Sequence, residues 1–231
     1  MKKLSLALAL ASLVGVTHAE VVGTAGVESN FVFRGVSQSA NAPSVVAGAT
    51  YELGGFYLGT TEHSVSGVQS GAGIRSDVVA GYGVQLGQVS VDVGSQNYFG
   101  ARQGLLNTNT NEVFVAAKYR IASVKYSRSI GNEFGLANSN GSSYLQTDLT
   151  YYIPQTAFAL TGHAGRQIDR MNSEFNHNDY SLGTQYKVGR WNLTAQVVAD
   201  SNKSAQFSNA ALVNGQNLAK RQVVLGVTTQ F

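Results

Sequence analysis

The 231-residue chain carries 16 basic and 13 acidic residues, 26 glycines, two prolines and no cysteine. The absence of cysteine excludes a disulfide framework and a lipid-modified cysteine, and the single, scattered basic residues exclude a nucleic-acid footprint. No apolar run after residue 19 is long enough for a membrane helix, so a fold that spans a bilayer would have to be a β-barrel.

The N-terminal segment has the pattern of a secretory signal peptide. Lys2 and Lys3 precede an apolar core at residues 4–16, and small residues at positions 17 and 19 precede Glu20. We therefore predict that residues 1–19 form a cleaved signal peptide and that residues 20–231 form one domain. Loss of the two lysines leaves the basic residues exceeding the acidic ones by only one, so the basic balance of the whole chain carries little information.

After residue 19 the chain alternates apolar and polar residues in runs of strand length, and no stretch has helical periodicity. These runs predict an all-β fold of about 12 strands, at residues 21–34, 43–51, 56–64, 74–85, 88–98, 111–119, 122–129, 143–153, 157–168, 178–187, 191–200 and 221–231. Short turns, most with glycine or proline, alternate strictly with long polar loops. This alternation predicts an antiparallel barrel whose two ends differ.

The final run, residues 221–231, has an oily side with Val223, Leu225 and Val227 and ends on Phe231. Such a strand can close a barrel against its first strand, so that no backbone edge faces lipid. Aromatic residues bracket most of the short turns, as in an interfacial girdle. The predicted fold class is therefore an all-β, transmembrane antiparallel β-barrel of outer-membrane type. A secreted β-sandwich or soluble barrel is the alternative.

The segment Phe31-Val-Phe-Arg-Gly-Val-Ser-Gln-Ser39, followed by Asn41 and Pro43, resembles the signature of the TorF family of porins, also described as the Gcw_chp family of unknown function. Gly55-Phe56-Tyr57 is similar to the turn exit that follows in this family. The resemblance is specific over residues 28–60 and looser elsewhere. It implies a barrel in the outer membrane of a Gram-negative bacterium and names no solute.

With the oily face toward lipid, the inward face of the predicted strands carries five acidic and five basic residues. A dry core could not hold these charges, since each unpaired ion costs several kcal/mol, whereas a water-filled lumen can. Their near balance predicts weak charge selectivity. The predicted lumen-lining residues are Glu28, Arg34, Arg75, Asp77, Asp92, Lys118, Lys125, Asp148, Lys187 and Asp200.

These features predict a narrow, porin-like channel for passive diffusion of small polar solutes, without a cofactor. The number of strands lies between filled eight-stranded barrels and open porins of sixteen or more. Charges that pair across the barrel would instead give a non-conducting barrel with a structural or surface-interaction role. The apolar patch in the loop at residues 201–220 predicts a constriction formed by Phe207, Leu212 and Val213, unless this loop only packs on its neighbours.

Three arginines share the lipid-facing side near the outer ends of their strands, Arg128, Arg166 and Arg221. They are predicted either to bind phosphates of lipopolysaccharide in bidentate fashion or to extend into solvent. Outer-membrane lipids and small polar solutes are thus the expected partners, and the oligomeric state is not predicted.

An outer-membrane lipid hydrolase is the third interpretation. It requires a histidine within reach of an activated serine, and neither His63 nor His163 has a serine at a suitable spacing. His163 is predicted to be an inward polar residue. His177 and Asp179 are two residues apart and could share a metal ion, although a solvated loop is the expected outcome. We therefore predict no catalytic residue and no metal site.

Overall fold

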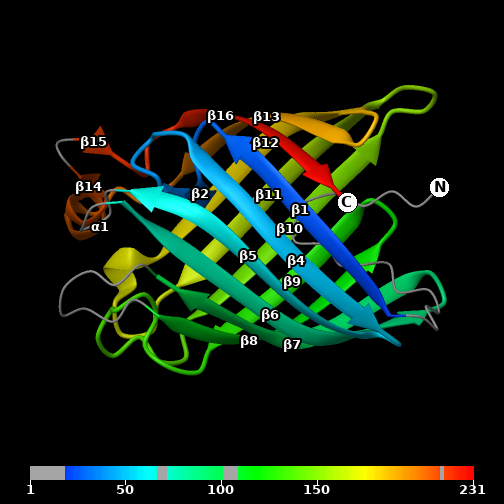
Figure 1. Cartoon of the computed structure of the whole chain (residues 1–231). Helices are drawn as coiled ribbons and strands as arrows, with labels where there is room; N and C mark the ends of the chain where they lie inside the picture. Colours follow the sequence, from blue (N-terminus) through cyan, green and yellow to red (C-terminus); the bar gives the residue numbers. More distant parts are fainter. Residues whose placement is uncertain (1–18, 67–71, 101–108, 214–215) are drawn as a thin grey trace.

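The computed structural model describes residues 19–66, 72–100, 109–213 and 216–231. Twelve antiparallel strands form a closed barrel (Figure 1), which confirms the predicted fold class. The predicted signal peptide lies outside the described residues except for Ala19. The barrel strands are β1 (Glu20–Glu28), β4 (Ser44–Leu53), β5 (Phe56–Ser66), β6 (Ala72–Leu86), β7 (Val89–Phe99), β8 (Thr110–Tyr119), β9 (Ala122–Ser129), β10 (Ser143–Tyr152), β11 (Phe158–Ile168), β12 (His177–Val188), β13 (Trp191–Asp200) and β16 (Gln222–Gln230).

The seam of the barrel joins β1 to β16. Val27 lies opposite Val227 in this pairing. The Gly23 N–H donates to the Phe231 carbonyl oxygen at 2.8 Å, and the Phe231 N–H donates back to the Gly23 carbonyl oxygen at 3.1 Å. The described barrel strands therefore leave no open edge, which is the condition for a sheet to face lipid.

Alternation along the strands separates an oily exterior from a polar interior. On β8, Val113 and Val115 are 44% and 48% exposed, whereas Glu112 and Phe114, which alternate with them, are 2% and 8% exposed. The same alternation leaves Leu145 and Leu149 of β10 exposed. An apolar outer face around polar inner positions suits a bilayer and is the reverse of a soluble barrel.

The two ends of the barrel differ, as the loop lengths predict. At one end, Gly54 and Gly55 alone connect β4 to β5, both with positive φ, and similarly tight turns connect the other hairpins (Figure 1). Exposed aromatic pairs lie beside these turns, such as Phe56 with Tyr82, whose ring centroids are 4.7 Å apart. Aromatic rings at one rim of the apolar belt are typical of a membrane interface.

Short elements lie at the opposite end of the barrel, where the long loops are. They are β2 (Val32–Phe33), β3 (Val36–Ser37), η1 (Ser173–Phe175), α1 (Ala205–Ala210), β14 (Leu212–Val213) and β15 (Gln216–Asn217). The predicted first strand is too long, because it ends at Glu28 and not at Arg34. The period-two pattern continues through β2, so alternation alone could not locate the break. No helix in the described part of the chain has the length and hydropathy needed to cross a bilayer.

One carboxylate interrupts the apolar exterior of the barrel. Glu62 of β5 shares its side of the strand with the exposed Leu58, and it lies opposite Ala47 of β4 and Ser76 of β6. Its carboxylate accepts a hydrogen bond from the Thr60 hydroxyl at 2.9 Å and another from the Ser76 hydroxyl. Neighbouring hydroxyls thus replace part of the hydration that this outward-facing charge lacks.

Candidate functional site in the barrel interior

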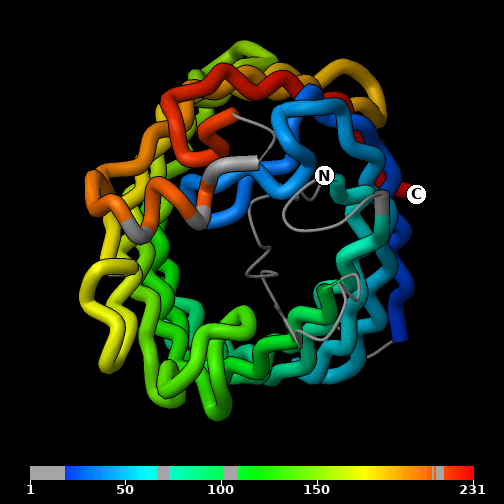
Figure 2. The backbone as a smooth tube through the Cα atoms, turned by 90° about the vertical axis from the view of Figure 1, so that its left-hand side faces the viewer, coloured from blue at the N-terminus to red at the C-terminus, as the bar shows by residue number. Residues whose placement is uncertain are grey.

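The loop between β1 and β4 folds into the barrel and carries the β2–β3 hairpin (Figure 2). Arg34 and Gly35 form its turn, with φ of 47° and 80°. Positive φ at both central residues is the geometry of a type I′ turn, which matches the twist of short hairpins. A Cβ atom at Gly35 would lie 2.9 Å from Cβ of Asp179 and 3.0 Å from Oδ2 of Asp200. Glycine is therefore required both for the turn and for its contact with the wall formed by β12 and β13.

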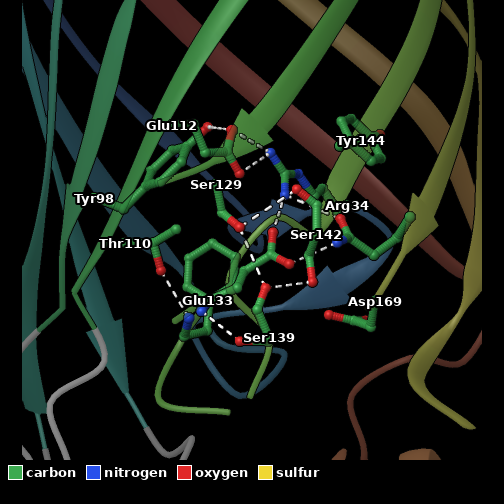
Figure 3. Close-up of polar contacts among 12 residues, drawn as sticks. Arg34, Tyr98, Thr110, Glu112, Ser129, Glu133, Ser139, Ser142, Tyr144 and Asp169 are labelled. Carbon is green, nitrogen blue, oxygen red and sulfur yellow. Dashed lines mark hydrogen bonds and ion pairs between the residues drawn. The ribbon is translucent and has the colours of Figure 1, made fainter. Parts of the chain in front are cut away.

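Arg34 extends from the hairpin to the far wall of the barrel (Figure 3). Its Nη2 donates to both carboxylate oxygens of Glu112 on β8 at 2.8 Å. Its Nη1 donates to Glu133, in the loop after β9, at 2.9 Å and to Gln167 of β11 at 3.0 Å. The Arg34 side chain is 7% exposed. Several charge-assisted hydrogen bonds to different partners fix the position of the guanidinium group as well as balancing its charge.

The charges around Arg34 depend on one another. Burial works against the charged guanidinium, but Glu112 foremost and also Glu133 favour it, and the pKa of Arg34 is raised above its ordinary value. Burial raises the pKa of Glu133 to about 8, and burial also raises the pKa of Asp169, which hydrogen-bonds to Glu133. Glu133 and Asp169 therefore bind a proton more readily than free carboxylates do, and Glu112 is the principal counter-charge of Arg34.

Aromatic rings surround the arginines of this region. The Arg34 guanidinium carbon lies 4.1 Å from the ring centroid of Tyr144, and that of Arg75 lies 3.9 Å from the ring centroid of Phe33. Arg75 also pairs with Asp77 through a 2.7 Å contact from Nε to Oδ1. Cation–π contacts of buried arginines contribute roughly 2 kcal/mol when desolvated. Phe33 therefore attaches the hairpin to β6, as Arg34 attaches it to β8.

The base of the hairpin has its own hydrogen-bond network. Oδ1 of Asn30 accepts from the hydroxyls of Ser37 at 2.6 Å and Ser39 at 2.9 Å. The Ser39 hydroxyl oxygen accepts from the Phe31 N–H at 2.9 Å, and the Phe31 ring stacks on His63 with centroids 3.8 Å apart. The serines of the family-like motif thus satisfy buried polar groups of the loop. The hairpin is consequently a fixed part of the interior.

The loop at residues 201–220 packs against this hairpin. The Ser37 N–H donates to the Leu218 carbonyl oxygen at 2.8 Å, and Leu218 is fully buried. Phe207 is buried, with its ring centroid 5.1 Å from that of His177. The side chains of Leu212 and Val213 lie outside the described part of the structure. Phe207 therefore packs on a neighbouring side chain, which is the alternative that the sequence left open. The first loop, in contrast, reaches across the interior.

A chain of histidine and carboxylates lines the inner face of β10 to β12. The Nδ1 atom of His163 lies 2.6 Å from Oδ1 of Asp148, and its Nε2 atom lies 2.9 Å from Oδ1 of Asp179. The Tyr144 hydroxyl donates to Asp179 at 2.9 Å. His163 is thus an inward polar residue, and charged groups in the wall are held by mutual hydrogen bonds.

His177 and Asp179 have separate partners and do not form a common site. Nε2 of His177 lies 3.1 Å from the Arg34 carbonyl oxygen and 3.7 Å from Oδ2 of Asp200. Within the described residues, no set of three or more histidine, cysteine or acidic side chains is arranged to hold a metal ion.

Nine of the ten predicted lumen residues lie on barrel strands, on the side opposite the exposed apolar residues. Arg34 is the exception, since it reaches the interior from the hairpin. The prediction of balanced charge omitted four buried carboxylates, Glu112, Glu133, Asp169 and Asp179. Glu112 and Asp179 alternate with exposed neighbours, so strand parity could have identified them, whereas the two loop residues gave no such signal. The described interior therefore carries more carboxylates than basic groups.

The outward arginines do not form one group. Arg128 of β9 and Arg166 of β11 flank β10, since Arg128 lies opposite Ser143 and Arg166 opposite Leu145. Arg221 precedes β16, and β12 and β13 separate it from β11. All three are exposed.

Comparisons with known proteins agree with this architecture. The KdgM porin in complex with disordered oligogalacturonate is similar over 93% of this chain and 99% of its own, with 11% identity and a TM-score of 0.57. The NanC porin is similar over 91% and 99%, with 12% identity and a TM-score of 0.55. No protein with a curated description matches the sequence. A family model described as a bacterial protein of unknown function (Gcw_chp) matches residues 15–231, and the chain therefore belongs to the Gcw_chp family.

Proposed function

We propose that this protein is an outer-membrane porin through which small polar solutes diffuse passively. The observation that carries the proposal is the charged interior, in which Asp92, Lys125 and Asp148 lie behind a largely apolar exterior. Charges at these positions require water or partners, and a barrel that only needed to fold could fill them with apolar side chains at less cost. The similarity to porins supports the fold. The resemblance to the TorF family of porins agrees with the proposed activity. Export by a signal peptide at residues 1–19 belongs to this proposal.

The pore is narrow on the loop-bearing side, because the hairpin occupies part of the interior and Arg34 spans it. The excess of inward carboxylates favours neutral and cationic solutes over anions, although the ion pairs at Arg34 and Arg75 keep the selectivity weak. This charge preference differs from that expected of a porin in complex with oligogalacturonate, because oligogalacturonate is a polyanion.

A non-conducting barrel is the second candidate, and the Arg34 network favours it. Side chains from the hairpin, β8, β11 and the loop after β9 meet around one guanidinium group, and such a cluster could close the barrel.

Planar-bilayer recording of the purified protein separates the two candidates. A channel gives discrete conductance steps, and its reversal potential in a KCl gradient gives the preference for cations. Absence of steps from the wild-type protein, together with absence of steps after removal of the hairpin, would contradict the porin proposal.

A further inference from the structure

Three exposed arginines lie at the loop end of β9 to β11. A Cβ atom built at Gly141 would lie 3.3 Å from Nη2 of Arg128 and 3.3 Å from Nη1 of Arg170, so the two guanidinium groups approach the same point. Arg166 lies on the other side of β10 from Arg128. We name Arg128, Arg166 and Arg170 the arginine cluster.

The cluster lacks counter-charges of its own. No salt bridge among the described residues includes any of the three arginines, and the one side-chain hydrogen bond of Arg166 goes to the neutral Asn178 at 3.3 Å. Like charges held close together repel, so an anion that bridges them gains the attraction of all three. Guanidinium groups match phosphate oxygens with two parallel hydrogen bonds.

The surface next to the cluster is apolar. Tyr126, Leu149 and Leu160 lie nearer the short-turn end of the same strands and are 41%, 45% and 50% exposed. The alternation that exposes these residues also places Arg128 and Arg166 on the exterior, since Lys125 and Gln167 on the opposite side are buried. A ligand that meets both surfaces must combine a phosphate with hydrocarbon, which is the chemistry of a membrane lipid.

The distribution of charge on the exterior of the barrel supports a ligand that carries phosphate at the cluster. Glu62, an outward-facing carboxylate of the described strands, is on β5, whereas the cluster lies at β9 to β11, so the two are on different parts of the wall. A phosphate is repelled at Glu62 and attracted at the cluster.

We propose that the arginine cluster binds the phosphates of lipopolysaccharide, with the acyl chains of the lipid lying on the apolar surface below. The proposal depends on the proposed outer-membrane location but not on conduction. Arg221 is excluded from the site because two strands separate it from β11.

The test measures binding of lipid A to the full-length protein in detergent containing EDTA, so that divalent cations cannot bridge acidic groups. The probes are bis-phosphorylated lipid A, lipid A with both phosphates removed, and inorganic phosphate. The variants are Arg128→Gln/Arg166→Gln/Arg170→Gln and the matched control Arg221→Gln. Arg170→Gln alone changes a loop residue and serves if the triple variant fails to fold.

We expect the triple variant to bind bis-phosphorylated lipid A roughly tenfold or more weakly than wild type, since hydrogen bonds between charged groups are among the strongest. Arg170→Gln should weaken binding by a smaller factor, and Arg221→Gln should bind as wild type does. Removal of the phosphates should abolish the difference between wild type and the triple variant. Equal binding by wild type and the cluster variants, or equal affinity of wild type for lipid A with and without phosphates, would overturn the proposal. Binding of inorganic phosphate as tight as that of lipid A would overturn the assignment to a lipid.

Discussion

The first and the last loops of the barrel meet at the same end of the molecule but are held by different chemistry. The first loop, residues 29–43, inserts a charged side chain between β8 and β11 and secures it with carboxylates. The last loop, residues 201–221, contributes Phe207, which packs on His177, and a backbone hydrogen bond from Ser37 to Leu218. An apolar patch packs wherever a neighbour offers a surface, whereas a buried arginine must reach its specific partners. The difference explains why Arg34 reaches the opposite wall of the barrel, whereas Phe207 packs on the nearby His177.

The largest expected effect follows from removing the hairpin. Replacement of residues 31–38 by glycine and serine takes Arg34 and Phe33 out of the interior, so single-channel conductance should rise several-fold. The same replacement at residues 205–211 is the control and should leave conductance close to that of wild type. A larger rise from the second replacement would reverse the assignment of the constriction to the first loop.

The next largest effect concerns the counter-charge of Arg34. Glu112→Ala leaves a buried guanidinium without its principal counter-charge, and breaking a buried ion pair in this way costs about 3–5 kcal/mol. The free energy of unfolding in lipid vesicles, from denaturant titration, should fall by this amount.

Two further variants control for this effect. Glu28→Ala breaks the less deeply buried pair with His63 and should cost less than Glu112→Ala. Arg34→Met/Glu112→Gln removes both charges and should recover much of the loss. If the double variant is as unstable as Glu112→Ala, the loss does not come from an unpaired Arg34.

Gly35 provides a smaller and more local test. Gly35→Ala and Gly87→Ala both place a Cβ atom at positive φ, which costs roughly 1–2 kcal/mol at each position. Only at Gly35 would the new atom also meet Asp179 and Asp200, since nothing lies within 4 Å of the Cβ position at Gly87. Overpacking of this kind adds about 1–3 kcal/mol, so Gly35→Ala should be the more destabilising variant in the same unfolding assay. Equal losses would indicate that the hairpin tip can move away from the wall.

The smallest expected effect is on pH dependence. Because the pKa of Glu133 is raised to about 8 in the folded protein, its contribution to stability is complete below the ordinary glutamate pKa and is lost as pH rises through about 8. The free energy of unfolding should therefore be lower at pH 9 than at pH 6, because burial opposes the charge that Glu133 gains in this range. Glu133→Gln should remove this dependence, and an unchanged pH profile in that variant would assign the effect to another group.

Much of the fold could be predicted because the information is local. Strand parity and glycine-bearing turns located the barrel strands to within a few residues, and the oily side of β16 indicated the seam. Parity also predicted an inward side for Arg75, Asp77 and Asp92. The break after Glu28 was missed for two reasons. β2 continues the alternation of the preceding strand, and the type I′ turn at Arg34-Gly35 resembles the turn that ends a strand.

The partners of Arg34 could not be predicted in the same way. Glu112 and Glu133 are distant from it in sequence, and the pairing depends on how far a loop reaches across a closed wall. Nothing in the sequence near Phe207 shows that its ring meets His177. Glu62 was also missed, since an outward carboxylate contradicts the pattern by which the strands were recognised.

The seam between β1 and β16 has a consequence for assembly. The strands that seal the wall are the first and the last of the barrel, so every shorter nascent chain has two open edges, and its sequence-distant pairing is slow to form. Open edges invite pairing with other chains. A sheet that still lacks β16 is therefore exposed to pairing with other chains, and the pairing of β1 with β16 removes both edges at once.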